Sequence, residues 1–380
     1  MAILPPELLH TIAQDVRGHS DICNLRLVSK SLNSVATPLA FRVIVVHDSV
    51  KSANAVSFLQ SCDESITSLV HEVVFRGDPE SSVESAGEAE TSGQAGREAL
   101  RIVFSGLNKF CSLQNLRLEF HDNHEEWNSD GPTHYLLLQK DIFTALASNL
   151  PPLLASLALI DMIAVPDDIY AQEDFHRVFR SLKTLEISVL CNADLEGVYC
   201  DEVLGEFWDQ SVPHMVRSAT AVTTLTIRSD LRVGALPAMT FDMFLPHLSS
   251  LVLHRFVLHD AVEFILDHKA TLTRLELYDC SIDGGLEGDI PRPWHAVFAS
   301  FEAELGALRD FVFESEGDWR FEYTLEDPGF GHVPFDDPEE DAEFLGKGLD
   351  GPALESLMAA VESRRRGRHT DDVQITAFQG

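Results

Sequence analysis

Several features that would define a membrane protein or a zinc protein are missing from the sequence. No stretch reaches about 18 consecutive apolar residues, which excludes a membrane-spanning helix. The N-terminus has no basic leader before an apolar run, so we expect no signal peptide. The six cysteines contain no C-x-x-C pair, which excludes a cysteine zinc site and favours free thiols in a reducing compartment. We therefore expect a protein of the cytoplasm, the nucleus or both.

Local motifs for catalysis are also missing. The phosphate-binding patterns G-x-G-x-x-G and G-x-x-x-x-G-K do not occur, and neither does the nucleophile pattern G-x-S-x-G. No cysteine lies in a local motif with a histidine that could act as its general base. We expect no catalytic residues and no cofactor, although Ser, His and Asp are abundant enough that a triad of distant residues stays open.

One short cluster carries groups that bind divalent metals. His121 and His124 flank Asp122, with Glu125 and Glu126 beside them. The H-x-x-H spacing is a weak metal signal, and a polar loop after a strand explains the cluster better. We expect no bound metal.

Basic residues are scarce relative to acidic ones. Lys and Arg number 28 against 61 Asp and Glu, for a formal net charge of −33, which repels nucleic acid and anionic lipid. We expect neither a nucleic-acid nor a membrane partner.

Much of the excess of acidic residues lies between Glu314 and Glu343. Residues 78–96 and 328–343 are expected to be disordered insertions, and a specific acidic docking arm at 314–343 is the alternative.

The first 46 residues predict three short helices. Pro5 precedes the first, Gly18 ends it and Ser20 can cap the second. The third should start near Lys30 and stop before Pro38, because a residue that precedes proline is disfavoured in the α region. Such a small unit cannot bury its own apolar residues, since chains below about 40 residues usually need a partner. The pattern therefore indicates docking.

Residues 1–46 resemble the F-box motif. The matching residues are Leu4-Pro5, Glu7-Leu8, Ile12, Leu25 to Lys30, Pro38-Leu39 and Phe41-Arg42. The resemblance implies docking on the Skp adaptor of a Skp–cullin–F-box ubiquitin ligase, with adaptor contacts at Leu4, Pro5, Leu8, Ile12, Leu25, Val28 and Lys30. Leu8 and Ile12 could instead be internal, and a helical cap on the following domain is the alternative for the whole segment.

An apolar triad, L-x-x-L-x-L or a close variant, recurs eight times after the helices. The copies lie at 70–75, 113–118, 154–159, 182–187, 222–227, 248–253, 272–277 and 308–313. Segments with helical apolar spacing alternate with them, and Phe41 to Val46 reads as a further strand. The shorter separations fit a leucine-rich repeat. Only Cys280 matches the Asn or Cys that the repeat prefers after the triad, where His121, Met162, Leu190, Asp230 and Phe256 stand in other copies.

The sequence thus predicts an α/β fold in which a three-helix F-box precedes a leucine-rich-repeat-like solenoid at 47–350, with parallel strands on the concave face and helices on the convex face. A doubly wound sheet is the alternative, but its glycine-rich turn is missing. Residues 351–380 read as a capping helix and tail. Arg364, Arg365, Arg366 and Arg368 suit a helix C-terminus, and a nuclear-import patch is the alternative.

Alternation along the strands sends the triads into the core and the intervening side chains to the other face. The predicted substrate-binding residues on that face are Arg117, Glu119, Glu186, Arg228, His254, Arg274, Glu276 and Tyr278. An ordinary solvated sheet face is the alternative. Together, the features predict a non-catalytic substrate receptor of a cullin-based ubiquitin ligase that binds an unidentified protein substrate. A leucine-rich interaction scaffold outside a ligase is the second possibility.

Overall fold

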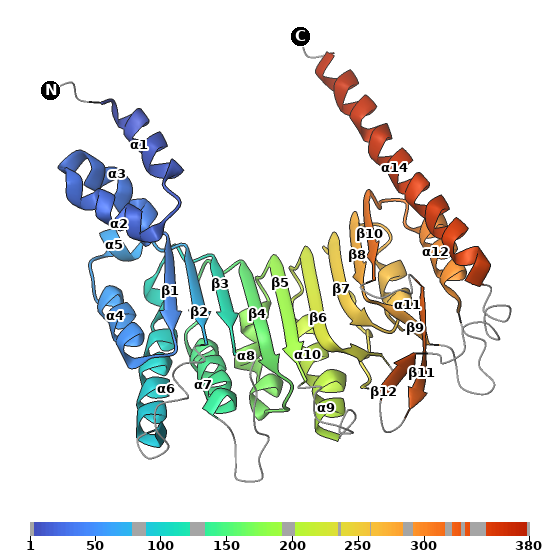
Figure 1. Ribbon diagram of the computed structural model, residues 1–380, viewed down its shortest axis with the longest axis horizontal. Coiled ribbons are helices and arrows are strands. Elements are labelled where there is room, and N and C mark those ends of the chain that lie inside the picture. Colours follow the sequence, from blue (N-terminus) through green and yellow to red (C-terminus); the bar gives the residue numbers. More distant parts are fainter. Residues whose placement is uncertain are drawn as a thin grey trace. The chain divides into compact units, whose positions relative to one another are not determined.

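The protein is α/β, with a mostly parallel nine-stranded sheet, in a computed structural model (Figure 1). The structure describes residues 4–77, 89–121, 134–191, 202–234, 237–258, 260–283, 292–315, 321–327, 331–334 and 347–377. The strand order in the sheet is β1-β2-β3-β4-β5-β6-β7-β8-β10. The chain forms two compact units, residues 1–159 and 160–380, which are described in turn. No helix among the described residues is long and apolar enough to span a membrane.

Three helices open the first unit, as predicted: α1 (Pro6–Asp15), α2 (His19–Val28) and α3 (Lys30–Phe41). The Ser29 side chain caps α3 by accepting a hydrogen bond from the Leu32 N–H at 3.2 Å. Gly18, and not Ser20, is the residue that precedes α2. A cation–π contact joins α2 to α3, with the Arg26 guanidinium 4.7 Å from the ring centre of Phe41.

The predicted end of the third helix before Pro38 is wrong, because α3 continues through Pro38 to Phe41. Proline has no N–H to donate to the carbonyl four residues earlier, which is that of Ser34. Burial offsets this loss, since Ala36 and Ala40 on the same helix are at most 2 % exposed. Tertiary packing therefore outweighs a local helix-breaking signal here.

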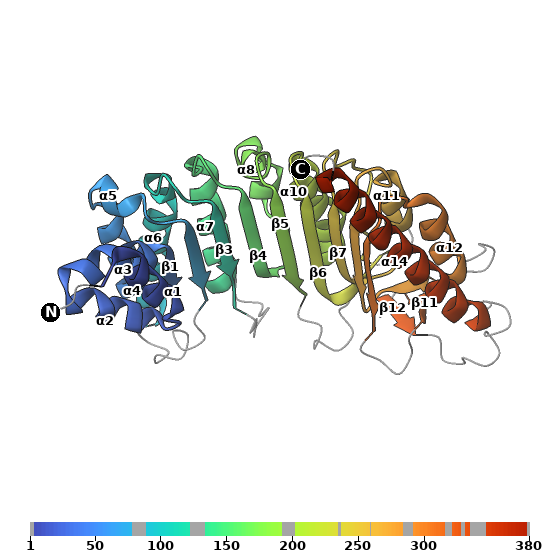
Figure 2. The same ribbon diagram turned by 90° about the horizontal axis from the view of Figure 1, so that it is seen from above.

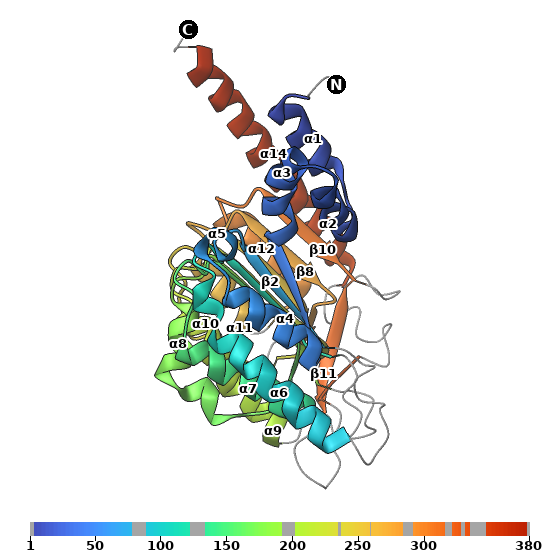
Figure 3. The same ribbon diagram turned by 90° about the vertical axis from the view of Figure 1, so that its left-hand side faces the viewer.

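In the first unit, strands β1, β2 and β3 run parallel, with Val43, Glu72 and Asn115 in register. Helices α4, α6 and α7 cover one face of these strands (Figure 3). The strands are β1 (Val43–His47), β2 (Glu72–Arg76), β3 (Asn115–Glu119) and β4 (Ser156–Ile163), which crosses the unit boundary. The further helices are α4 (Val50–Gln60), α5 (Glu64–Thr67), α6 (Ala89–Ser105), η2 (Leu107–Lys109) and α7 (His134–Ser148).

The second unit continues the same strand–helix alternation, with helices α8, α10 and α11 on one side of its strands (Figure 2). Its parallel strands are β5 (Thr184–Leu190), β6 (Thr224–Val233), β7 (Ser250–Phe256), β8 (Arg274–Tyr278) and β10 (Asp310–Glu314). A three-stranded sheet contains β9 (Ser281–Asp283), β11 (Glu322–Asp327) and β12 (Gly331–Pro334). The helices are η3 (Asp168–Ala171), α8 (Glu173–Phe179), α9 (Glu202–Glu206), the π-helical η4 (Phe207–Ser211), α10 (Val212–Ser218), α11 (Asp260–Asp267), α12 (Trp294–Glu304) and α14 (Lys347–Ala377).

All eight apolar triads mark strands, as their spacing predicted: the first residue of each triad precedes the strand, and the other two lie on it. Every residue of the first seven triads is at most 2 % exposed. In the eighth, Leu308 is fully buried, whereas Phe311 and Phe313 on β10 are half-buried. The triads are therefore the core of each unit, and truncating one such leucine to alanine should cost about 2–5 kcal/mol.

A left-handed residue follows three of the triads by two positions. Asp161, Arg255 and Asp279 have φ of 56°, 61° and 49°. The next residue in each copy, Met162, Phe256 or Cys280, is at most 2 % exposed. A left-handed residue interrupts the two-residue alternation and turns the next side chain back toward the core. The repeat position that prefers Asn or Cys is thus a buried position here.

The structure describes part of each predicted insertion, and their disorder stays a prediction. α6 begins at Ala89, and β12 pairs antiparallel with β11. Small residues allow the start of α6 to pack closely, because a Cβ on Gly93 would lie 3.2 Å from the His134 ring. Residues 78–88, 328–330 and 335–343 lie outside the described residues.

The predicted C-terminal helix is present as α14, which begins at Lys347, four residues before the predicted start. Arg364 donates Nη1 to the carbonyl of Leu305, 3.1 Å away, and Nη2 to that of Glu302. Arg366 pairs with Glu362 at 2.8 Å. Arg364 thus binds α14 to the end of α12. This is a structural role, which a nuclear-import patch would not require.

Candidate functional site

The three N-terminal helices expose large apolar side chains. Among the predicted adaptor contacts, Leu4, Leu8 and Ile12 are 47 %, 51 % and 46 % exposed, and Val28 is 70 % exposed. Pro5 and Lys30 are also exposed, whereas Leu25 is half-buried. Exposed apolar side chains mark a docking surface where they form one contiguous patch.

Leu27 is the apolar residue that sequence reasoning missed in this segment. It is 85 % exposed, next to Val28 at the end of α2. No described residue of α2 is buried. The signal was available in the sequence, because Leu25, Leu27 and Val28 cannot all face inward when successive helical residues turn by about 100°.

A polar sheet face in the second unit is the other candidate surface. The register places Glu186, Val252 and Glu276 in one row, and Arg228, His254 and Tyr278 in the next. The buried triads occupy the opposite face of the same strands. The six predicted residues of this unit are thus brought together on four neighbouring strands, namely Glu186, Arg228, His254, Arg274, Glu276 and Tyr278.

Glu276 lies on β8, the last of these four strands, and is only 6 % exposed. Arg274 donates Nε to its Oε1 at 2.5 Å, and the Tyr278 hydroxyl donates to its Oε2 at 3.0 Å. Burial raises the pKa of Tyr278, and the hydrogen bond to Glu276 raises it further. The tyrosine therefore stays protonated and remains a donor to the carboxylate. Two donors make the buried charge tolerable.

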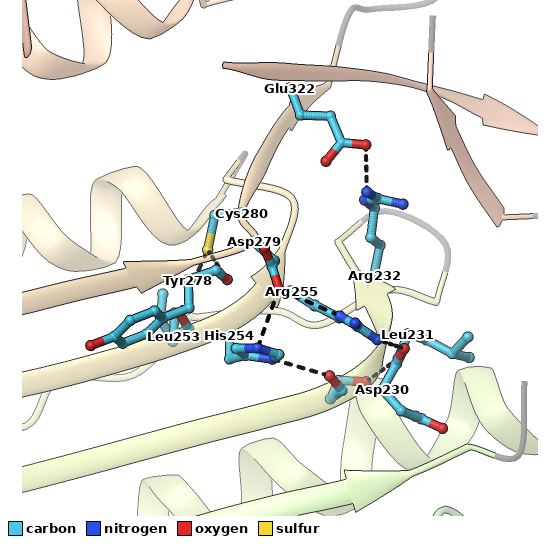
Figure 4. Close-up of polar contacts among 11 residues, drawn as sticks. Asp230, Leu231, Arg232, Leu253, His254, Arg255, Tyr278, Asp279, Cys280 and Glu322 are labelled. Carbon is cyan, nitrogen blue, oxygen red and sulfur yellow. Dashed lines mark hydrogen bonds and ion pairs between the residues drawn. The ribbon is translucent and has the colours of Figure 1, made fainter. Parts of the chain in front are cut away.

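A second polar cluster follows the carboxyl ends of β6, β7 and β8 (Figure 4). His254 Nε2 lies 3.4 Å from Oδ2 of Asp279, and Arg255 Nε lies 3.9 Å from the same oxygen. Arg255 also donates Nη1 to the carbonyl of Asp230 at 2.7 Å. The left-handed backbone at Arg255 and Asp279 sets the directions of both side chains. Sequence reasoning found His254 but neither of its charged neighbours.

The two cysteines nearest to this cluster are not poised as nucleophiles. Burial raises the pKa of Cys280 to about 12 and raises that of Cys191 well above its usual value. The nearby Asp230 carboxyl adds to the shift at Cys191. Because the thiolate is the reactive form, the raised pKa values disfavour reaction at both thiols near neutral pH.

The two predicted residues of the first unit form a separate group. Glu119 on β3 accepts from Arg117 Nε at 2.6 Å and from Arg76 Nε on β2 at 3.0 Å. In the second unit, Arg228 Nε lies 3.6 Å from Oε1 of Glu186. These charges are paired and partly exposed, so each pair contributes about 0–1 kcal/mol to stability.

The weak metal alternative finds no support at the one residue that can be assessed. The His121 ring is buried and stacks on Tyr135 with ring centres 5.1 Å apart. Asp122, His124, Glu125 and Glu126 lie outside the described residues. Within the described residues, no group of three or more His, Cys, Asp or Glu side chains could hold a metal ion.

Comparison with known proteins adds no family assignment to this geometry. No protein-family model matches the chain, and no curated protein matches it either.

Proposed function

We propose that the chain is the substrate-recognition subunit of a Skp–cullin–F-box ubiquitin ligase and works in the cytoplasm or nucleus. In this proposal, α1–α3 are the F-box that binds the Skp adaptor. The later strand–helix units form a leucine-rich-repeat-like solenoid whose concave face binds a protein substrate. The observation that carries the proposal is the exposure of Leu8, Ile12, Leu27 and Val28 on a three-helix unit that resembles the F-box.

Exposed apolar side chains support adaptor binding on physical grounds. Burying a leucine or valine side chain in an interface is worth about 1.5–3 kcal/mol relative to leaving it in water. Several such residues gather on α1 and α2. A partner that covers them gains apolar burial, which counts against the entropy lost on association.

The proposed subunit performs no chemistry itself. It would hold a substrate near a charged ubiquitin-conjugating enzyme and thereby raise the local concentration of the two reactants. The row of Arg228, His254 and Tyr278, beside the buried Glu276, supports the binding of a polar protein surface. Arg228 is half-exposed and can contact such a surface directly.

The test is co-purification of the full chain with the Skp adaptor. Leu4→Ala with Pro5→Ala, and separately Leu27→Asp, should reduce recovery of the adaptor. Leu153→Asp is the matched control, because Leu153 is 54 % exposed but lies far along the chain from the helices. Failure of the wild-type chain to bind the adaptor would sink the ligase proposal. A leucine-rich scaffold outside a ligase would then be favoured.

The substrate can be sought by mass spectrometry of proteins that accumulate on the chain when ligase turnover is blocked. Arg228→Glu should release a true substrate without releasing the adaptor. A captured protein that is retained equally by this variant would not be bound at the proposed face.

A further inference from the structure

The first strand of the sheet has an unpaired edge. Arg42 accepts hydrogen bonds from the N–H groups of His71 and Glu72 beside β2, and Asp48 donates to Arg76 at 3.1 Å. Peptide groups alternate in direction along a strand, so those of Val43 and Val45 point away from β2. Across the described residues, neither has a main-chain partner on that side. The edge thus offers the N–H and C=O groups of two residues at strand spacing.

The unpaired edge is short because α4 closes it at one end. The His47 N–H donates to Ser52 Oγ at 2.9 Å, and its carbonyl accepts from the Ser49 N–H at 2.7 Å. Proteins commonly protect edge strands with charged side chains, proline or a bulge. β1 has the sequence VIVVH and uses none of these devices. An edge strand without these protections can pair with an extended segment of another chain.

An apolar pocket of about 530 Å³ lies along this edge. Val43, Ile44 and Val45 line it from β1, and Phe58 lines it from α4. Phe58 is 73 % exposed and Val45 is 40 % exposed. The pocket can therefore receive apolar side chains from a segment that lies against β1.

The one charged residue among the described residues that line the pocket is basic. Arg26 lines it together with His19, and none of its described lining residues carries a carboxylate. This is unusual for a chain with a net charge of −33. The same net charge opposes pairing of two copies of the chain at this edge.

We propose that β1 binds an extended segment of a partner protein by strand addition, as a site separate from the adaptor surface. Only an extended backbone can satisfy the peptide groups of Val43 and Val45 together. Alternate apolar side chains of the segment enter the pocket, and one of its carboxylates faces His19 and Arg26. The inference does not depend on the ligase proposal, because it rests on the strand edge and the pocket alone.

The test is selection of a displayed library of short random peptides on the full chain. Enriched peptides should alternate apolar residues and carry one Asp or Glu. A fluorescein-labelled synthetic copy of the most enriched peptide is then titrated against variants. Val45→Pro removes the outward N–H but should leave the pairing with β2 intact, and it should weaken binding about tenfold.

Two further variants keep the test decisive. Val45→Thr retains the N–H and should bind within about twofold of the wild type. Phe58→Asp changes the pocket without touching β1 and should also weaken binding, whereas Ile102→Asp, at a 54 % exposed site on α6, should not. If thermal unfolding shows that Val45→Pro does not fold, the comparison of Phe58→Asp with Ile102→Asp decides the result.

Three results would overturn the proposal. The first is a selection that enriches no peptide with alternating apolar residues, or that enriches one which binds the Phe58→Asp and Val45→Pro variants as tightly as it binds the wild type. The second is a wild-type dimer by light scattering that Phe58→Asp converts to a monomer, which would assign the edge to a second copy. The third is loss of Skp adaptor binding in Phe58→Asp, which would make the edge part of the adaptor surface.

Discussion

The Tyr323 hydroxyl donates a hydrogen bond to Oδ2 of Asp350, 2.8 Å away, and Asp350 is fully buried. The other carboxylate oxygen accepts from the main-chain N–H of His295 at 2.8 Å. Tyr323 lies on β11, His295 on α12 and Asp350 in the first turn of α14. One buried carboxylate therefore joins three elements of the second unit.

Tyr323→Phe should lower the free energy of unfolding by about 1.5–3 kcal/mol, because a buried carboxylate loses a donor. The Trp294 N–H also loses the hydroxyl as its acceptor. Urea unfolding followed by circular dichroism measures the change. Tyr278→Phe is the control, and its smaller expected loss reflects a more exposed hydroxyl. Equal losses in the two variants would mean that Asp350 does not depend on Tyr323.

Arg255→Val should destabilise the protein by about 1–2 kcal/mol more than Arg255→Asn. Both variants remove the guanidinium, but a β-branched residue is strained at the φ of 61° that Arg255 adopts, whereas asparagine tolerates it. The difference between the two variants in thermal unfolding measures the free-energy cost of the left-handed backbone. Indistinguishable stabilities would argue against a left-handed residue at this position.

Pro38→Ala should raise the free energy of unfolding by about 1–3 kcal/mol, since it restores a main-chain donor inside α3. Pro6→Ala is the matched control. Pro6 is the first residue of α1, where a missing N–H costs nothing, so no gain is expected there. A gain in the control but not in Pro38→Ala would contradict this account of the two helices.

Asp230→Asn should stabilise the protein near neutral pH. Burial raises the pKa of Asp230 above its usual 3.8, so the folded state binds the proton more tightly than the unfolded state does. The wild type therefore regains stability as the pH falls through the raised pKa, and the regain is complete below about 3.8. Asparagine keeps an oxygen to accept from the Cys191 N–H, which Asp230 Oδ1 accepts at 2.8 Å. Unfolding free energies from pH 7 to pH 4 measure the difference, and a difference that does not change with pH would contradict the assignment.

The sequence was sufficient to place the strands of the nine-stranded sheet and its two faces. Leu275 and Leu277 alternate along β8 and Leu272 precedes that strand, and all three lie in the core. The same alternation gives the contacts of Glu276 with Arg274 and Tyr278, which are two residues away on the same strand. Local periodicity therefore predicts these parts of the fold and of the candidate face.

Other features depend on partners far along the chain. The contact between His254 and Asp279 requires left-handed backbone at Asp279, which no apolar pattern encodes. β9 pairs with β11, some forty positions later, and Ile282 is in register with Tyr323. The continuation of α3 through Pro38 depends on burial of Ala36 and Ala40. These were determined by tertiary packing, not by local preference.

Strand order has a consequence for how the chain is made. In the first unit β1 pairs with β2 and β2 with β3, and in the second unit β5 to β8 pair in succession. Each of these strands after β1 has the preceding strand as a neighbour, so a chain leaving the ribosome can fold progressively, as N-terminal regions generally do. Pausing of translation within these segments should leave little unpaired strand exposed. β9 is the exception, because its strand neighbour β11 is synthesised only after β10 has followed β9.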